Sequence, residues 1–431
     1  MAQSVRFSDL SVRGPHADFR VKNVDLAIVN ALRRSILAEV QTAAFCFKPD
    51  TAENTVEINM NSTVLHNEFM GHRISLVPIH LTEDETSDVA EGKLKYEFHL
   101  AAKNTTTLPI DVTSGDITAT LNGAPVSKDV LSRMFPDDPV TRDHILIVRL
   151  KPGSGGEVQD AEELDATCTL RMGSGKDHAR WAPASICTFG NKIDDAKADA
   201  VLLEEVAKAR EGHASDEEIA RVTHDFMSMG RHRCYLVDDH GEPAEFNFKI
   251  RTECGLRPAY LVFKGLDVLV RRLVVLSSNV LNALPSDPAT PATVTIDTYG
   301  TVTGMFQFSI EHEDHTIGNL VQSTLFNKHI RSQDNDATKN DLEYVGYYQP
   351  HPLEHRIILR VKVSDKLASG VQRFTSSCID AVAADIRDII TDWIDFSGLT
   401  GVREVDEFRA ARLLSTNKPV AKKPKAVAKK S

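Results

Sequence analysis

The chain has 431 residues, of which 42% are hydrophobic and 26% are charged, so it is long enough to form two or three domains with their own cores. Its formal net charge is −11, and an acidic body repels nucleic-acid phosphates, which argues against a protein that holds DNA by its own charge. No apolar run approaches the roughly 20 residues that a membrane helix needs. The six cysteines are far apart, and the first residues lack the basic and apolar parts of a signal peptide, so we expect an intracellular protein with free thiols.

The first predicted elements are one strand and one helix. Phe19 and Val21 alternate with polar residues, as in a strand with one buried face. Asp25 follows as the expected N-cap of a helix whose apolar residues recur at helical spacing as far as Val40. One face of this helix must therefore be covered by another part of the molecule.

A β-rich segment follows this helix. It is rich in turn residues and poor in helical periodicity. We expect it to form an insert domain over residues 46–164. Its predicted strands are Thr55–Met60, Leu94–Ala101, Ile110–Thr113, Ile117–Leu121 and His144–Leu150.

Charged helical sequence occupies residues 195–229. Gly212 interrupts it, and Ser215 with Glu218 has the spacing of a capping box. The pattern predicts one or two solvated helices and indicates no function for them.

A second strand and helix, and then a linker, follow. Phe246 and Ile250 alternate as in a strand, and apolar residues between Leu266 and Leu284 recur with helical period. Prolines punctuate residues 285–303, which disfavours a helix there. A flexible linker of about 16 residues spans roughly 20 Å, so the next segment can fold back onto the first.

The segment after the linker repeats the beginning of the chain. Phe308–Phe326 aligns with Phe19–Leu37 at a constant offset (308 − 19 = 289), which places Asp314 on Asp25. The second copy also continues with another alternating strand and another amphipathic helix. A repeat this long that occurs twice predicts two homologous halves and not a solenoid.

We therefore predict an α+β fold of two strand-helix-strand-helix units, packed face to face about a pseudo-twofold axis as a dimer interface would be. The β-rich insert interrupts the first unit. Six lysines and no acid lie in residues 416–431, which is typical of a disordered tail. The predicted domains are 1–45 with 165–284 (first unit), 46–164 (insert), 285–303 (linker), 304–397 (second unit) and 398–431 (tail).

Six blocks of sequence carry a family resemblance. In the first unit and its insert, the blocks Asn23–Val40, Asn61–Ile79, Gly173–Ala184 and Phe246–Pro258 resemble the third-largest subunit of eukaryotic RNA polymerase II, its archaeal D-type counterpart and, more remotely, bacterial alpha. In the second unit, Glu311–Leu325 and Tyr344–Val361 resemble the smaller partner of that protein, which is the eleventh subunit or its archaeal L-type counterpart. The match covers nearly all of residues 1–396 in the right order. The two partners look fused, as in some large DNA viruses.

The resemblance implies a polymerase subunit with no catalytic residues of its own, because the family's magnesium-binding acids belong to the largest subunit. It implies a platform that recruits the second-largest and largest subunits, with small polymerase subunits as further partners, DNA contact only through the complex, no membrane, and pairing of the two halves in cis. The expected location is the virion and a cytoplasmic virus factory if the chain is viral, and the nucleus otherwise. No metal or other cofactor is expected, because residues 47–167 lack the cysteines that bind a zinc ion or iron–sulfur cluster in some relatives.

The helix after Asp25 is expected to supply interface residues. By resemblance these are Asn30, Arg33, Arg34 and Glu39. The two arginines point about 100° apart on a helix, so one is expected to brace the pair of units and the other to project outward. The alternative is that both merely solvate the helix, since exposed charges contribute little.

Further expected interface residues lie in the insert and just after it. His66, Glu68 and Arg73 belong to a block that supports subunit contact in the family. Trp181 stands beside Pro183 and is a candidate interface anchor, because large aromatic side chains dominate many interfaces.

His315, Gly318 and Asn319 match the smaller partner's helix start, which packs tightly against its mate. Gly318 allows close approach, although glycine disfavours a helix by roughly 1 kcal/mol relative to alanine. A metal at His312, Asp314 and His315 is the alternative, but a polar residue at a helix start caps free N–H groups, which favours packing.

His351 and His355 have the spacing of two metal ligands on a helix face, yet Pro352 and the apolar strand that follows favour a loop. A zinc enzyme would need Glu354 or a distant third ligand. The resemblance instead assigns both histidines to a structural loop of the smaller partner.

No Walker loop, nucleophile elbow or HExxH motif appears in the sequence. Two main hypotheses remain. One is a non-catalytic assembly subunit of a multisubunit DNA-directed RNA polymerase. The other is a stand-alone transcription regulator that uses the basic tail on DNA, which would bind DNA by itself with a steep salt dependence.

Overall fold

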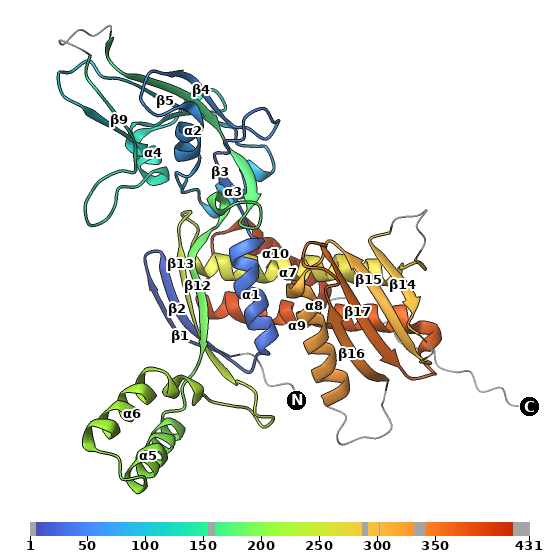
Figure 1. The fold of residues 1–431 in the computed structure, drawn as a ribbon. Coiled ribbons are helices and arrows are strands. Elements are labelled where there is room, and N and C mark those ends of the chain that lie inside the picture. The colour runs from blue at the N-terminus through green and yellow to red at the C-terminus, as the bar shows by residue number, and fades with distance from the viewer. Residues whose placement is uncertain (1–5, 154–159, 287–291, 301, 332–340, 417–431) are drawn as a thin grey trace, which may run out of the picture.

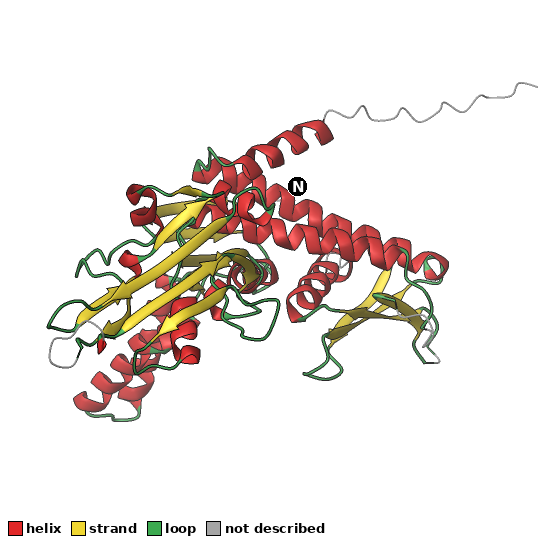
Figure 2. Ribbon diagram, turned by 90° about the horizontal axis from the view of Figure 1, so that it is seen from above, coloured by secondary structure: helices red, strands yellow, loops and turns green. Residues whose placement is uncertain are grey.

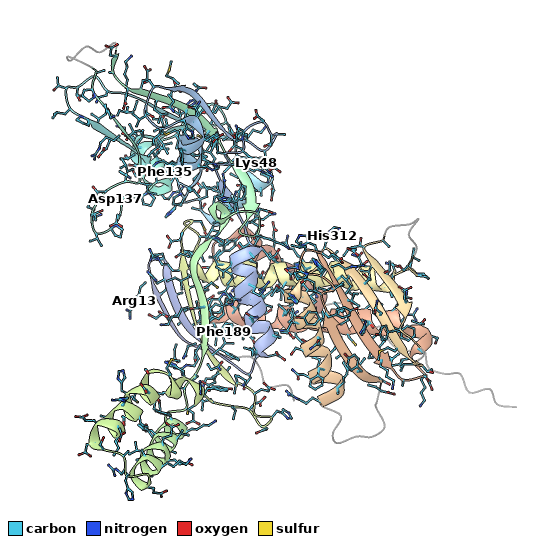
Figure 3. The ribbon with its side chains drawn as sticks, in the orientation of Figure 1. Arg13, Lys48, Phe135, Asp137, Phe189 and His312 are labelled. Atoms are coloured by element: carbon cyan, nitrogen blue, oxygen red, sulfur yellow. The ribbon has the colours of Figure 1, made fainter. Side chains whose placement is uncertain are left out.

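The computed structural model describes residues 6–153, 160–286, 292–300, 302–331 and 341–416. Two α+β units stand side by side, an insert extends from one end of the first unit, and a helical hairpin extends from the other end (Figure 1). Figure 3 places Phe135 in the insert, Phe189 on the sheet of the first unit and His312 in the second unit.

The two units have the same strand order. Each contains a four-stranded antiparallel sheet, ordered β1-β2-β13-β12 in the first unit and β14-β15-β17-β16 in the second. The strands are β1 (Arg6–Arg13), β2 (His16–Lys22), β12 (Ala184–Asn191), β13 (Glu245–Thr252), β14 (Val294–Thr298), β15 (Met305–Glu311), β16 (Leu342–Tyr348) and β17 (Arg356–Val363).

Each sheet carries one shorter and one longer helix. These are α1 (Leu26–Ala38) and α7 (Pro258–Leu281) in the first unit, and α8 (His315–Leu325) and α9 (Val371–Ser397) in the second. A π-helical turn, η6 (Phe326–Ile330), extends α8.

The predicted pair of dimerisation units is confirmed, and each unit has two more strands than expected. The additional strands β1, β12, β14 and β16 form the sheet edges, where the alternation of apolar residues is weak. In β1 the register shifts between Ser8 and Ser11, and Asp9 adopts a φ of +56°. Such a bulge disrupts the period-two pattern from which a strand is predicted. Strand β14 also lies within residues 285–303, where the sequence predicted only a linker.

One apolar core joins the two units. The long helices α7 and α9 lie side by side across the molecule (Figures 1 and 2), and their facing residues belong to a single cluster of buried side chains. Leu269 and Leu273 of α7 and Ile386 and Ile390 of α9 are all 0% exposed. Burying a leucine or isoleucine side chain stabilises a fold by about 1.5–3 kcal/mol, so this seam is a major source of stability.

Helix α1 packs onto α7 at a glycine. Ser35 Oγ donates to the Gly265 carbonyl at 2.9 Å. A Cβ at Gly265 would lie 2.8 Å from the Ile36 Cγ1 atom, so the close approach of the two helices needs this glycine.

The insert has its own core, which includes Phe98, Met134 and Leu150. A two-stranded ribbon of β3 (Gln41–Ala44) and β11 (Arg171–Ser174) leads into and out of it. The five predicted strands are present, whereas its three helices were not predicted. The elements are β4 (Val56–Asn61), α2 (Asn67–Ser75), α3 (Glu83–Ala90), β5 (Tyr96–Lys103), β6 (Ile110–Thr113), β7 (Thr118–Leu121), β8 (Ala124–Pro125), α4 (Lys128–Met134), β9 (Leu146–Leu150) and β10 (Glu163–Thr169).

The charged segment forms a hairpin of α5 (Asp195–Glu211) and α6 (Asp216–Ser228). The chain breaks at Gly212, and Ser215 and Glu218 form the predicted capping box. In the described part of the chain, no helix has both the length and the apolar character needed to cross a membrane.

The C-terminal segment differs from its prediction. The sequence predicted a disordered tail from residue 398, but helix α10 (Arg403–Thr416) follows α9. Val402 and Val405, which are 1% and 0% exposed, anchor its start in the main core. A pattern with so few apolar residues did not indicate a packed helix. The remainder of the predicted tail, residues 417–431, lies outside the described residues.

Candidate functional site

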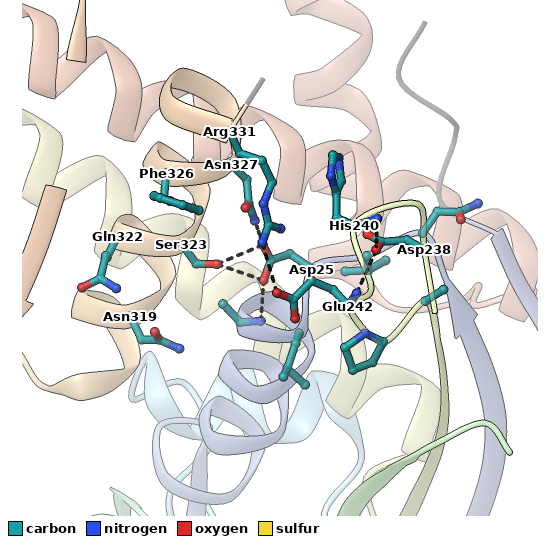
Figure 4. Close-up of a pocket in the computed structure, with 16 residues that line it drawn as sticks. Asp25, Asp238, His240, Glu242, Asn319, Gln322, Ser323, Phe326, Asn327 and Arg331 are labelled. Carbon is teal, nitrogen blue, oxygen red and sulfur yellow. Dashed lines mark hydrogen bonds and ion pairs between the residues drawn. The ribbon is translucent and has the colours of Figure 1, made fainter. Parts of the chain in front are cut away.

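The candidate site is the interface between the two units, and its first part is the crossing of α1 and α8. Asp25 begins α1, where its Oδ1 atom accepts a hydrogen bond from the Ala27 N–H at 2.7 Å. The same carboxylate accepts bonds from the second unit, from Ser323 Oγ at 3.0 Å and from the Asn327 side-chain amide (Figure 4). One acid therefore caps a helix and holds the other unit.

The other side of the crossing is closely equivalent. Asp314 begins α8 and accepts from the Thr316 N–H at 2.9 Å, while Arg34 Nε donates to Thr316 Oγ1 at 2.8 Å. The repeat offset of 289 relates Asp25 to Asp314 and Arg34 to Ser323 (25 + 289 = 314; 34 + 289 = 323). The same position on each helix thus reaches the start of the opposite helix, which is the signature of a pseudo-twofold axis.

The seam of α7 and α9 shows the same reciprocity. Trp393 Nε1 donates to the Ala259 carbonyl at 2.8 Å, and Gln372 Nε2 donates to the Ala283 carbonyl at 2.5 Å. The start of each long helix therefore lies beside the end of the other. Between these contacts, the hydroxyls of Ser277 and Ser376 lie 2.8 Å apart in the buried seam.

A buried arginine links both helix pairs. Arg272 of α7 has a side chain only 16% exposed, and its guanidinium lies 3.1 Å from Glu39, 2.5 Å from Glu313 and 3.6 Å from Asp314. Glu39 ends α1, whereas Glu313 and Asp314 precede α8. A single cation thus holds three carboxylates from both units, and we call these four residues the Arg272 cluster.

The ionisation of the Arg272 cluster follows from its burial. Burial would lower the pKa of Arg272, but the three carboxylates hold it above its ordinary value. Burial, which disfavours the charged form, raises the pKa of Glu313. Arg272 lowers it, but the neighbouring carboxylates of Asp314 and Glu39 also raise it. Burial also opposes ionisation of Asp314, yet Arg272 and the Thr316 N–H lower the pKa of that carboxyl. Each charge in such a site depends on its partners.

A polar cleft of about 660 Å³ opens beside the crossing, between the start of α1, the loop of residues 238–244 and α8 (Figure 4). Asp238 accepts from the backbone N–H groups of His240 and Glu242 at 2.9 Å each, and Arg331 lies 3.1 Å from Glu242. Asp238, Glu242 and Arg331 are thus all paired within the chain.

The predicted interface residues of α1 make different contacts. Arg34 crosses to the second unit, and Glu39 belongs to the Arg272 cluster. Arg33 donates to Asn30 Oδ1 through Nε at 3.1 Å and through a terminal nitrogen at 3.0 Å, and both residues are half-buried.

Gly318 packs differently from its prediction. A Cβ there would lie 2.5 Å from the Tyr347 ring, so the close approach is to β16 of the same unit and not to the other unit. His315 Nδ1 lies 3.3 Å from the Tyr347 hydroxyl. Asn319 lines the polar cleft.

His66, Glu68 and Arg73, which were predicted as interface residues, lie in the insert and not in the unit that contains α1. His66 and Glu68 are exposed around the start of α2, and the His66 ring lies 4.5 Å from the Phe69 ring. Arg73 donates to the carbonyls of Leu146 and Ile147 at 2.9 and 2.7 Å, which ties α2 to β9.

Trp181 is not an exposed anchor, because it is 4% exposed and packs inside the chain. Its indole N–H donates to the Arg171 carbonyl at 3.0 Å. The guanidinium carbons of Arg171 and Arg180 lie 5.7 and 5.5 Å from the ring centre. The side chain therefore stabilises the base of the ribbon of β3 and β11 and cannot project to a partner.

His351 and His355 lie in the exposed β16–β17 hairpin loop, as the proline predicted. His351 Nδ1 accepts from the Leu353 N–H at 3.2 Å, and Glu354 pairs with Arg356 at 2.6 Å. Across the described ranges, no group of three or more His, Cys, Asp or Glu side chains is arranged to hold a metal ion.

Arg272 and Glu313 are the important site residues that sequence reasoning missed. The available signal was a pair of arginines inside an otherwise apolar helix, LVRRLVV, because a buried arginine needs a carboxylate partner. The partners could not be inferred, because Glu39 and Glu313 are distant from Arg272 in the sequence.

Comparisons with known proteins agree with this arrangement. A family described as the RNA polymerase Rpb3/Rpb11 dimerisation domain matches residues 18–273, and a second family with the same description matches residues 305–396. The chain is 27% identical over 309 residues to subunit 3 of the DNA-directed RNA polymerases II, IV and V of Arabidopsis thaliana, which covers 62% of this chain and 90% of the relative. It is 29% identical over 277 residues to the polymerase subunit Rpo3 of Thermococcus kodakarensis, with 62% and 95% covered. With subunit RPB3 of Schizosaccharomyces pombe RNA polymerase II, identity is 25% over 279 residues, covering 60% and 82%.

Proposed function

Because the chain belongs to the Rpb3/Rpb11 dimerisation-domain family of RNA polymerase subunits, we propose that it is the assembly subunit of a multisubunit DNA-directed RNA polymerase. In this proposal it performs no chemistry itself. Its two units form the platform on which the second-largest and then the largest subunit assemble, together with small subunits, and it meets DNA only through the complex.

The observation that carries the proposal is the reciprocal pairing of the two units. In both helix crossings the two units contact each other at both ends, as around a pseudo-twofold axis, and one apolar core runs through both units. Obligate interfaces are core-like and bury on the order of 2,000–5,000 Å². A chain that carries both halves needs no second chain to complete the platform, because the linker keeps them at an effective concentration on the order of millimolar.

The outer side of α1 is the proposed docking face for the large subunits. Asn30 and Arg33 form a hydrogen-bonded pair there, and the exposed Leu26 lies on the preceding turn. An arginine presented beside apolar surface is a common anchor of protein interfaces. The exposed His66 and Glu68 of the insert form a second, separate contact in this proposal.

The source and place of action are also proposals. The presence of both family matches in one chain supports a fused arrangement of the two partners. We propose a polymerase of a large DNA virus, which would place the subunit in the virion and in a cytoplasmic virus factory. A cellular polymerase would place it in the nucleus.

Charge reversal on α1 tests the docking face. Arg33→Glu is expected to weaken association with the large subunits at least tenfold in co-purification from the native source. The matched control is Arg210→Glu, an equal charge reversal on the exposed α5, which should co-purify normally. Both variants should unfold at the temperature of the wild type.

Three outcomes would contradict the proposal. The first is normal co-purification of Arg33→Glu with the large subunits. The second is an equal loss of co-purification in both variants. The third is tight binding of DNA by the isolated chain with a steep salt dependence, which would instead support a stand-alone regulator.

A further inference from the structure

The start of α10 meets the insert and the first unit at the same place. Glu404 accepts from Lys264 Nζ at 2.7 and 2.6 Å and from the Tyr260 hydroxyl at 2.8 Å, both on α7. It also accepts from Ser87 Oγ of the insert helix α3 at 3.1 Å. One carboxylate thus joins two bodies of the molecule, and its pKa stays low because these donors outweigh the effect of burial.

The neighbouring arginine binds the acidic face of α3. The Arg403 backbone N–H donates to Asp84 at 3.0 Å, and its guanidinium lies 2.8 Å from Asp88 and 3.4 Å from Glu91. The side chain is 35% exposed, so no single pair among these is worth much by itself. Together the contacts align α3 with the start of α10.

A second arginine, from the first unit, also contacts α3 and the segment before α10. Arg257, which precedes α7, donates to Glu83 of α3 through Nε at 2.8 Å and through its backbone N–H at 3.2 Å. Its guanidinium also donates to the Thr400 carbonyl at 3.3 and 3.4 Å. Glu83 is 8% exposed, whereas the Arg257 side chain is 47% exposed, so only the carboxylate of this pair is removed from water.

Buried apolar residues hold the segment between α9 and α10 against the core of the paired units. Leu399, Val402 and Val405 are 2%, 1% and 0% exposed and belong to the core that joins the two units. The segment between α9 and α10 therefore cannot move from α3 without exposing part of that core. Figure 1 shows α10 at the junction of the insert with the paired units.

We propose that residues 399–404 form a joint that fixes the orientation of the insert relative to the paired units, so that docking of the second unit also positions the insert. We call the contacts of Thr400, Arg403 and Glu404 with α3 and α7 the C-terminal joint. The inference goes beyond the assembly role, because α10 lies after the second family match, which ends at residue 396.

The joint adds to a narrow connection. The insert is linked covalently to the first unit through the ribbon of β3 and β11. It also touches the segment before α7, where a Cβ at Gly255 would lie 2.7 Å from His80 Cβ and where Arg257 donates to Glu83. The contacts of Arg403 and Glu404 add a second element, α10, that holds α3 in place.

A spin-label distance measurement tests the joint in the full chain. Cysteines introduced at the exposed Glu57 of β4 and Asp380 of α9 would carry the labels, because five native cysteines are buried and Cys254 is half-buried. The wild type should give one narrow distance distribution. Arg403→Glu and Asp88→Arg should each at least double its width, and the double variant should restore it.

The matched control is Glu407→Arg, an exposed charge reversal on the same helix, which should leave the distribution narrow. Circular dichroism must show that each variant is folded. If Arg403→Glu and Asp88→Arg are folded and the distribution stays as narrow as in the wild type, the insert is held by the ribbon and by the contacts of His80 and Glu83 with the segment before α7, and the proposal is wrong. Equal broadening in Glu407→Arg would also overturn it.

Discussion

The two helix crossings of the pair interface are built differently. The seam of α7 and α9 buries fully enclosed leucine and isoleucine residues, and its polar contacts are few. The crossing of α1 and α8 relies on caps, cross-unit hydrogen bonds and the Arg272 cluster. Burial of apolar side chains stabilises the interface but depends little on their relative orientation. Ion pairs and hydrogen bonds form only at particular distances and angles. The seam should therefore supply most of the free energy of pairing, and the crossing should fix the register of the units.

Among the variants that test this comparison, removal of Arg272 should lower the free energy of unfolding most. Arg272→Ala leaves three carboxylates without their cation, and breaking a buried ion pair costs about 3–5 kcal/mol. Denaturant unfolding should show a loss of that size. The neighbouring Arg271→Ala is the control, since its exposed side chain pairs with Asp267 on the same helix, and it should cost less than about 1 kcal/mol. Similar losses for the two variants would show that the buried Arg272 cluster contributes no more to stability than an exposed ion pair.

A cavity in the seam should have the next largest effect. Leu273→Ala removes a fully buried side chain one residue after Arg272, which costs about 2–5 kcal/mol. The control is Val275→Ala on the same helix, where the side chain is 60% exposed and the loss should be small. Unlike Arg272→Ala, the leucine variant should keep the register of α1 and α8, measured as unchanged amide protection at the start of α8. A shift in that protection would contradict the division of roles.

Low pH should have the smallest of the three effects on the free energy of unfolding. It should act through protonation of Asp314 at the crossing of α1 and α8. The pKa of Asp314 is lowered in the folded state, so its contribution to stability is present above its ordinary value of 3.8 and is lost as the pH falls through and below that value. Glu313 partly offsets this loss, because its raised pKa makes the folded state bind a proton more readily. The difference in unfolding free energy between the wild type and Asp314→Asn should therefore shrink between pH 6 and pH 3. A difference that stays constant over this range would exclude a charged role for Asp314.

The crossing of α1 and α8 was largely predictable, because both caps and both helices recur at one offset. The offset places Asp25 on Asp314, and both side chains prove to be caps at the interface. The buried faces of α7 and α9 were visible in their helical period. These features are local in the sequence or repeat within it, and local patterns are the ones that a single sequence reports.

Features that depend on distant partners were missed. Arg272 lies far in the sequence from Glu39, and Glu404 lies farther still from Ser87. Val402 and Val405 are deeply buried around the start of α10, but the described residues that follow are mostly charged or exposed and looked like a solvated tail. Trp181 was predicted to be an interface anchor because of its size, and size alone does not distinguish an exposed tryptophan from a buried one.

Cleavage of the connection between the two units tests whether they hold each other together without a covalent link. A specific protease site introduced within residues 285–293 would separate the units covalently, and native mass spectrometry would then report their association. We expect the two fragments to remain together as one 1:1 complex at micromolar concentration and to separate only on unfolding. Recovery of two separate, folded fragments would show that the buried stripes of α7 and α9 do not need each other, and it would contradict the account.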